Sequence, residues 1–289
     1  MPHQPRRFAG IAVAMIAALG AAMLAACGGG GGSGGPSDAN ATGTAAGTPG
    51  LSGSITVYAA SSLTAAFYKE AAAFQQSHPD MRVNFNFAGS STLVTQLDQG
   101  APADVLATAD EKNMKAASDK SLVTGDVRVF ARNRLVIAVP RDNPGNVQAP
   151  ADLARRGLKI VLAQAGVPVG NYARQSLSKM EADPAFGVGF SDNVLKNVVS
   201  EESNVKGVIS KIQLGEADAG IVYLTDVTIG VGIDVTTIEI PESFNVIASY
   251  PIAVTAHASN PALAAEFVQF VLSKEGQQIL SESGFMEAQ

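Results

Sequence analysis

From residue 54 onward, stretches with the periodicity of β-strands alternate with stretches that have the periodicity of helices. Residues 82–88 (RVNFNFA) alternate apolar and polar side chains, as a half-buried strand does, whereas Leu63, Phe67 and Phe74 fall at helical spacing. The pattern predicts strands over 54–60, 82–88, 103–109, 134–140, 158–164, 219–226, 233–241 and 245–255. It predicts helices over 63–78, 91–100, 111–120, 170–181, 204–218 and 260–283 (one long helix or two short ones), with a helical turn over 152–157. Alternation with short connections predicts an α/β fold with largely parallel sheets.

Two stretches could carry the chain between two lobes, residues 125–134 and residues 243–250. A chain that crosses twice would form one lobe from 54–131 plus 250–289 and a second lobe from 132–249. Ligands of open α/β sheets bind at the carboxyl ends of the strands, so the ligand cleft is expected between the lobes.

The beginning of the chain has the form of a secretory signal peptide, predicted over residues 1–26: a basic start, a short apolar run and small residues at the cut. Its Leu-Ala-Ala-Cys ending resembles a bacterial lipobox, which implies cleavage before Cys27 and lipidation of the Cys27 thiol. The alternative is a transmembrane anchor, but the apolar run is interrupted by Gly20 and is shorter than the ~20 residues that a span needs. Residues 27–53 are rich in Gly, Ser, Ala and Thr and are predicted to be a flexible tether.

Composition narrows the classes of function. Apolar residues make up 46% and charged residues 16% of the 289 residues, which is typical of a globular protein. Cys27 is the only cysteine, so the exported part would have no internal disulfide and no cysteine nucleophile. Loss of residues 1–26 removes two arginines and no acids, which moves the net charge from −6 to −8. An acidic chain without a basic stripe argues against nucleic acid as a partner.

Two junctions between a strand and a helix contain a serine pair: ITVYAASSLTAAF at 55–67 and VNFNFAGSSTLVTQL at 83–97. A helix N-terminus carries about half a positive charge and free N–H groups, so it can bind an anion. Ser62 and Ser90 are therefore the leading candidates for ligand contact in the first lobe. The alternative is that each hydroxyl is a plain N-cap of its own helix.

The second lobe offers three further candidates. GVPVGNY (166–172) is either a ligand-binding turn, in which Gly170 allows a close approach, or a simple connection between a strand and a helix. Val205, at the start of the next predicted helix, could offer its backbone N–H or only pack. Tyr223 ends a strand and could place its hydroxyl at the cleft, although a core position is the commoner explanation for a lone tyrosine.

Signals of catalysis are weak. From residue 54 onward there is no G-x-S-x-G elbow, and the chain has no G-x-x-x-x-G-K-[ST] motif. His78 and His257 fall in predicted loops. A metal cluster of Asp98, Asp104 and Asp110 is a weaker interpretation than caps and solvated turns.

The junctions strongly resemble the molybdate-binding proteins of bacterial ABC importers. The matching segments are ITVYAASSL, FNFAGSSTLVTQL, GAPADVLATADEKNM, RLVIAVP, VPVGNYARQSL, GEADAGIVYLTD, YPIAVT and SESGF, in family order over nearly all of 54–286. The resemblance implies a type II periplasmic-binding-protein fold whose two lobes close on a tetrahedral oxyanion. It implies contacts from Ser62, Ser90 and Tyr223, and from the backbone N–H groups of Val169 and Val205, with Ser61 and Ser91 as alternative donors.

The implied function is an extracytoplasmic receptor that binds molybdate and tungstate and delivers them to a separate ABC permease with its ATPase. Such a receptor is not an enzyme, needs no cofactor, binds no metal as a free cation and is expected to be a monomer anchored to the cell membrane through lipid. The nearest alternative is a receptor for another oxyanion, such as sulfate or phosphate, on the same fold. An exported hydrolase is the alternative from a different class, and it would need a base near Ser62 or Ser90.

Overall fold

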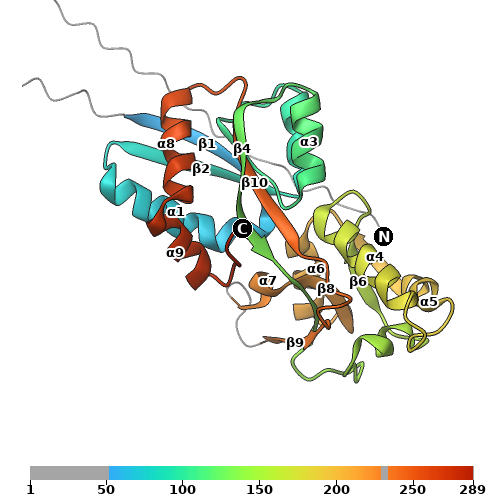
Figure 1. Cartoon of the computed structure of the whole chain (residues 1–289). Coiled ribbons are helices and arrows are strands. Elements are labelled where there is room, and N and C mark those ends of the chain that lie inside the picture. Colours follow the sequence, from blue (N-terminus) through green and yellow to red (C-terminus); the bar gives the residue numbers. More distant parts are fainter. Residues whose placement is uncertain (1–51, 229–233, 289) are drawn as a thin grey trace, which may run out of the picture. The chain divides into compact units, whose positions relative to one another are not determined.

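The computed structural model describes residues 52–228 and 234–288, which form two lobes, each built around a mixed sheet (Figure 1). The predicted signal peptide, Cys27 and nearly all of the predicted tether lie outside the described residues. Among the described residues, no helix is long and apolar enough to cross a membrane.

The first lobe contains a sheet in the order β2-β1-β3-β10-β4. The strands are β1 (Gly53–Ala60), β2 (Met81–Ala88), β3 (Val105–Ala107), β4 (Val123–Asn133) and β10 (Ala248–Thr255). The helices are η1 (Ser61–Leu63), which continues as α1 (Thr64–Ser77), α2 (Ser90–Asp98), α3 (Glu111–Asp119), α8 (Pro261–Leu272) and α9 (Lys274–Glu282). Successive strand residues face opposite sides of a sheet, so Val57 packs in one apolar cluster and Tyr58 in another. Helices therefore cover both faces, with α1 and α8 on one and α2 and α3 on the other.

The second lobe contains a sheet in the order β7-β6-β8-β5-β9. Its strands are β5 (Leu135–Pro140), β6 (Ile160–Ala163), β7 (Val198–Glu202), β8 (Ala219–Tyr223) and β9 (Val235–Glu239). Its helices are η2 (Pro150–Ala154), α4 (Pro168–Glu181), α5 (Phe190–Lys196), α6 (Val205–Gln213) and α7 (Leu224–Thr228). The chain passes from the first sheet to the second between β4 and β5, and returns between β9 and β10.

The prediction of largely parallel sheets is wrong for half of the strand pairs. β1 pairs in parallel with β2 and β3, and β6 does so with β7 and β8. In contrast, β10 is antiparallel to β3 and β4, and β5 is antiparallel to β8 and β9. The antiparallel strands β5 and β10 are those through which the chain enters a sheet from the other lobe, so their direction is set by the crossing rather than by a helical crossover.

Several elements differ from the sequence prediction. Residues 125–134 were predicted to carry the chain between the lobes, but residues 123–133 form β4, an edge strand whose exposed first half hides the alternation. β7 and α5 were not predicted, because each is short and only partly buried. Residues 224–226 were predicted as the end of a strand but belong to the short helix α7. The terminal segment forms two helices, which separate where the Ser273 hydroxyl accepts a hydrogen bond from the Gly276 N–H and caps α9.

Candidate functional site

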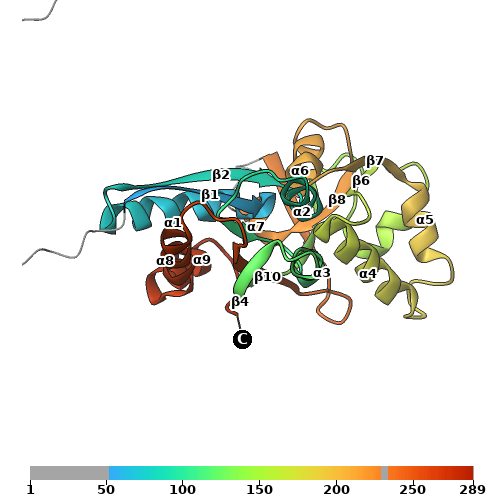
Figure 2. The ribbon, with the colours of Figure 1, turned by 90° about the horizontal axis from the view of Figure 1, so that it is seen from above.

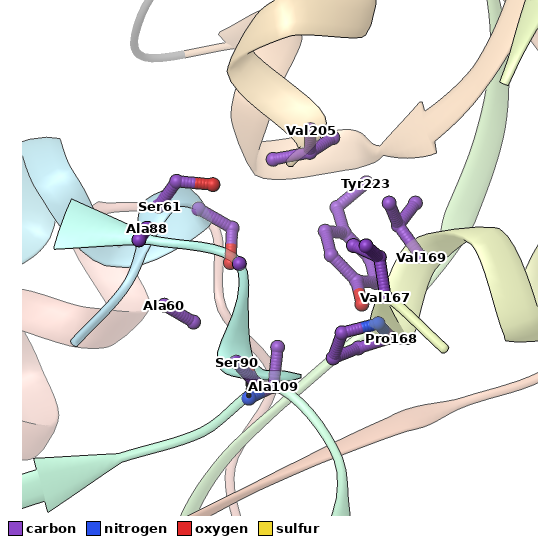
Figure 3. A pocket seen from close by; sticks show the side chains of 12 residues that line it. Ala60, Ser61, Ala88, Ser90, Ala109, Val167, Pro168, Val169, Val205 and Tyr223 are labelled. Atoms are coloured by element: carbon purple, nitrogen blue, oxygen red, sulfur yellow. Dashed lines mark hydrogen bonds between the residues drawn. The ribbon is translucent and has the colours of Figure 1, made fainter. Parts of the chain in front are cut away.

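A small pocket lies between the two lobes (Figure 3). It is lined by Ala60, Ser61, Ser62, Ala88, Gly89, Ser90, Ala109, Val167, Pro168, Val169, Val205 and Tyr223. All five residues that the sequence suggested as ligand contacts are among them. In Figure 3, Ser61, Ser90 and Ala109 lie on one side of the pocket, while Val169 and Tyr223 lie on the other. Of the two alternative serines, Ser61 lines the pocket and Ser91 does not.

Four helix N-termini contribute most of this lining: those of η1 with α1, of α2, of α4 and of α6. The N-caps of η1, α2 and α4 are Ala60, Gly89 and Val167, and none of them supplies a side-chain cap. The N-cap of α6, Asn204, accepts a hydrogen bond from the Gly207 N–H and leaves that of Val205 uncapped. The first N–H groups of a helix have no intrahelical partner, so these termini present free donors to the pocket.

Neither serine is the N-cap of its helix, so the plain capping alternative does not describe them. Ser62 lies inside η1, and Ser90 is the first residue of α2. The Ser90 Oγ instead accepts a hydrogen bond of 3.0 Å from the backbone N–H of Ala109. The Ser62 Oγ lies 3.0 Å from the Tyr250 hydroxyl. The acceptor side of Ser90 is thus occupied by its own chain, and its O–H hydrogen is available to a ligand.

Tyr223 is completely buried, at 1% exposure, yet its hydroxyl has no hydrogen-bond partner among the described residues. Burial, with a smaller contribution from nearby Tyr250, raises the pKa of Tyr223 well above its ordinary value, so the hydroxyl keeps its proton. A buried hydroxyl without a partner costs about 1–3 kcal/mol. Because Tyr223 lines the pocket, a ligand bound there would be able to supply the missing acceptor.

Val169 and Val205 are both buried and occupy early positions of α4 and α6. Pro168 precedes Val169 and has no N–H of its own, so Val169 provides the first backbone donor within α4. Val167, Pro168 and Val169 of this turn line the pocket, whereas Gly170 does not. A Cβ on Gly170 would lie 2.3 Å from the carbonyl oxygen of Gln164, so this glycine is required by close packing of α4 on the chain that follows β6.

The two lobes approach each other closely at the pocket, where the residue before α2 meets the segment that precedes α6. Figure 2 shows where these two helices lie in the fold. A Cβ on Gly89 in the first lobe would lie 2.4 Å from the carbonyl oxygen of Ser203 in the second. The cavity volume of the pocket is about 10 Å³, far below the ~300–1,000 Å³ typical of pockets for drug-sized molecules. The arrangement therefore suits a small ligand held by both lobes.

No residue that lines the pocket carries a charged side chain, and none is a histidine. Four helix N-termini, each with about half a positive charge, together supply roughly two positive charges. The side-chain hydroxyls and free N–H groups are donors, while no carboxylate is present to accept a proton from a ligand. The pocket can therefore hold a fully deprotonated dianion without a cationic side chain.

The acids considered as a metal cluster serve structural roles. Asp104 accepts hydrogen bonds from the backbone N–H groups of Thr56 and Ser259, and Asp110 caps α3. Asp98 forms an ion pair with Lys120. Among the described residues, no group of three or more potential metal ligands is found.

The chain is similar to known solute-binding proteins. A family model described as bacterial extracellular solute-binding protein matches residues 55–286. A molybdate-binding protein ModA of Mycobacterium tuberculosis is 39% identical over 279 residues, covering 96% of this chain and 98% of that protein. The Escherichia coli protein of the same name is 30% identical over 243 residues, covering 81% of this chain and 89% of that protein.

Solved structures show the same two-lobed fold. The substrate-binding domain of a putative molybdenum ABC transporter from Clostridium difficile aligns with a TM-score of 0.60 and 28% identity, covering 82% of this chain and 99% of that chain. The sulfate-binding protein SubI of M. tuberculosis aligns with a TM-score of 0.73 and 18% identity, covering 81% of this chain and 87% of that chain. At that identity the likeness to SubI concerns the fold alone.

Proposed function

We propose that this chain, which belongs to the bacterial extracellular solute-binding proteins, is a receptor that binds molybdate and tungstate and delivers them to an ABC permease. The proposed ligand contacts are Ser62, Ser90 and Tyr223, together with the backbone N–H groups of Val169 and Val205. These residues line one pocket, and the relatives that match nearly the whole chain are named as molybdate-binding proteins.

The observation that carries this proposal is the buried Tyr223 hydroxyl, which has no partner among the described residues and lies in a pocket of neutral donors. Burying a dianion away from water is costly unless its oxygens are hydrogen-bonded. The pocket offers donors from both lobes, so an oxyanion would satisfy Tyr223 and be satisfied in return.

The donor set also favours one class of oxyanion. Phosphate carries a proton at neutral pH, and that proton needs an acceptor such as a carboxylate, which the pocket lining lacks. Molybdate and tungstate carry no proton at neutral pH, and their metal–oxygen bonds are longer than the S–O bonds of sulfate. A pocket fitted to the larger anions would leave sulfate with poorer contacts.

The rest of the proposal concerns the setting of the receptor. Residues 1–26 would be a lipoprotein signal peptide, Cys27 the lipid-anchored residue and residues 27–53 the tether. Residues 54–131 plus 250–289 and residues 132–249 would be the two lobes that close on the anion. The protein would act as a monomer on the extracytoplasmic face of the membrane, without enzymatic activity, and its permease and ATPase would be separate chains.

Thermal unfolding of the full chain in detergent, with each of four anions in turn, tests the proposal. Molybdate or tungstate at 100 times its Kd should stabilise the fold by about 2.7 kcal/mol, a rise in Tm of roughly 5–10 °C for a chain of this size. Sulfate and phosphate at the same concentration should raise the Tm far less. A rise with sulfate or phosphate alone would keep the fold and overturn the ligand, while no rise with any of the four would overturn the oxyanion receptor.

A further inference from the structure

Tyr250 stands directly behind one of the proposed ligand contacts without lining the pocket itself. It lies in β10, is completely buried and packs its ring against those of Tyr223 and Phe285, at centroid distances of 5.8 and 5.4 Å. Its hydroxyl lies 3.0 Å from the Ser62 Oγ. Either of these hydroxyls could be the donor, and which one donates decides where the Ser62 hydrogen points.

Asn133 determines the direction of this hydrogen bond. Its Oδ1 accepts a bond of 2.9 Å from the backbone N–H of Arg134, so its Nδ2 must be the end that faces the other way. That Nδ2 donates to the Thr225 Oγ1 at 2.8 Å and to the Tyr250 hydroxyl oxygen at 3.5 Å. The Tyr250 oxygen therefore receives a hydrogen from Asn133, and its own hydrogen must go elsewhere.

Among the described residues, the Ser62 Oγ is the one acceptor within hydrogen-bond distance of the Tyr250 hydroxyl. A buried hydroxyl hydrogen without an acceptor is costly, so the favoured arrangement has Tyr250 donating to Ser62. Burial raises the pKa of Tyr250 well above its ordinary value, and the hydroxyl therefore remains a donor.

We propose that Tyr250 is a positioning residue for anion binding: its hydroxyl donates to the Ser62 Oγ and thereby directs the Ser62 hydrogen into the pocket. The inference rests on the proposed function, because it concerns how the oxyanion is held. The order of donation runs from Asn133 to Tyr250, from Tyr250 to Ser62, and from Ser62 to a ligand oxygen. Hydrogen bonds in such a chain polarise one another, which makes Ser62 a stronger donor.

Ser90 also accepts a hydrogen bond from the protein, but from a backbone donor rather than from a side chain. The Ser90 Oγ accepts from the backbone N–H of Ala109 and is left to donate outward. Ser62 receives the equivalent bond from a side chain that is remote in sequence. This difference makes the role of Tyr250 accessible to mutation, whereas that of the Ala109 N–H is not.

A double-mutant cycle on the full chain tests the proposal, with the Kd for molybdate measured by titration calorimetry. Ser62→Ala should weaken binding about 10-fold or more, because it removes a hydrogen bond to a charged ligand. Tyr250→Phe should weaken binding about 3- to 10-fold when Ser62 is present, and less than about 2-fold when Ser62 is already alanine. Tyr58→Phe is the matched control, because Tyr58 is buried in the first lobe and does not line the pocket, and it should bind as the wild type does.

A purely structural role for Tyr250 would lower affinity by the same factor with and without Ser62, and that result would overturn the proposal. Wild-type affinity in Tyr250→Phe would overturn it as well. Failure of the proposed function looks different, since the wild type itself would then not bind molybdate. In that case the cycle is run with whichever of tungstate, sulfate or phosphate raises the Tm, and binding of none overturns both proposals.

Discussion

The two lobes contribute to the pocket in different ways. In the first lobe, the Ser62 and Ser90 oxygens already have hydrogen-bond partners from the protein, namely Tyr250 and the N–H of Ala109. In the second lobe, the Tyr223 hydroxyl has no partner among the described residues. The serines of the first lobe are therefore held in place by their own lobe, whereas the Tyr223 hydroxyl is left without an acceptor. In the proposed site, this difference would place preorganisation on one side of the cleft and the response to the anion on the other.

The lobes also differ in how their buried acids are paired, and here it is the acid of the first lobe that has no partner among the described residues. Glu70 in α1 is completely buried, and neither of its carboxyl oxygens has a hydrogen-bond partner in the part of the chain that the structure describes. Burial, with a smaller contribution from Glu275, raises its pKa to about 9, so it is neutral at pH 7. Asp226 in α7 is equally buried, but it forms an ion pair of 3.0 Å with Lys206, the residue after Val205. The buried acid of the second lobe thus has a counter-charge, although burial still raises the pKa of Asp226 above its ordinary value.

The largest expected effect follows from breaking that pair. Lys206→Met should lower the free energy of unfolding by about 3 kcal/mol, because it leaves the Asp226 carboxylate buried without a counter-charge. Denaturant unfolding without ligand measures it, and Lys206→Met combined with Asp226→Asn should recover most of the loss. An unchanged midpoint in the single variant would show that Asp226 does not depend on Lys206.

Glu70 in the first lobe should make the stability of the protein depend on pH. Since its pKa in the fold is about 9 and its ordinary value is 4.5, the fold binds the proton more tightly than the unfolded chain does. The free energy of unfolding should therefore fall as the pH rises from about 5 toward 9, with a slope of at most about 1.4 kcal/mol per pH unit from this group. Glu70→Gln should remove this contribution and be more stabilising at pH 8 than at pH 5. The exposed Glu242→Gln is the control, and equal effects of both variants at the two pH values would contradict the assignment.

The close approach of the lobes can be blocked at Gly89. A Cβ there would lie 2.4 Å from the Ser203 carbonyl oxygen, so Gly89→Ala should hold the lobes apart. Overpacking of this kind costs about 1–3 kcal/mol, which predicts a loss of roughly 10- to 100-fold in affinity for molybdate with little change in Tm without ligand. Ser91→Ala on the same helix should bind as the wild type does. Full affinity in Gly89→Ala would mean that the lobes do not need this contact to hold the anion.

The smallest effects are expected from removing a single hydroxyl, and they test the difference between the two lobes directly. Tyr223→Phe should weaken molybdate binding about 10-fold while leaving the Tm without ligand unchanged or higher, because it removes a buried hydroxyl that has no partner among residues 52–228 and 234–288. Ser90→Ala should weaken binding and also lower the stability without ligand by about 1 kcal/mol, because the Ala109 N–H loses its acceptor. Calorimetry gives the affinities and thermal unfolding gives the stabilities. The comparison between the lobes would fail if both variants changed stability in the same direction.

The sequence by itself determined which segments line the pocket. Strands that run into helices through small residues leave free N–H groups, and this local pattern located Ser62, Ser90 and the turn that contains Val169. It also indicated the α/β alternation, since periodicity and turn residues are properties of neighbouring positions.

Only the tertiary structure decided what each hydroxyl is bonded to and which strands run antiparallel. Tyr250 and Asn133 carry no local signal, because their role depends on contacts 188 and 117 positions apart along the chain. The Tyr223 hydroxyl, which has no partner among the described residues, and the close approach at Gly89 arise in the same way. Each depends on contacts between residues that are far apart in the sequence, and a pattern of neighbouring residues does not specify such contacts.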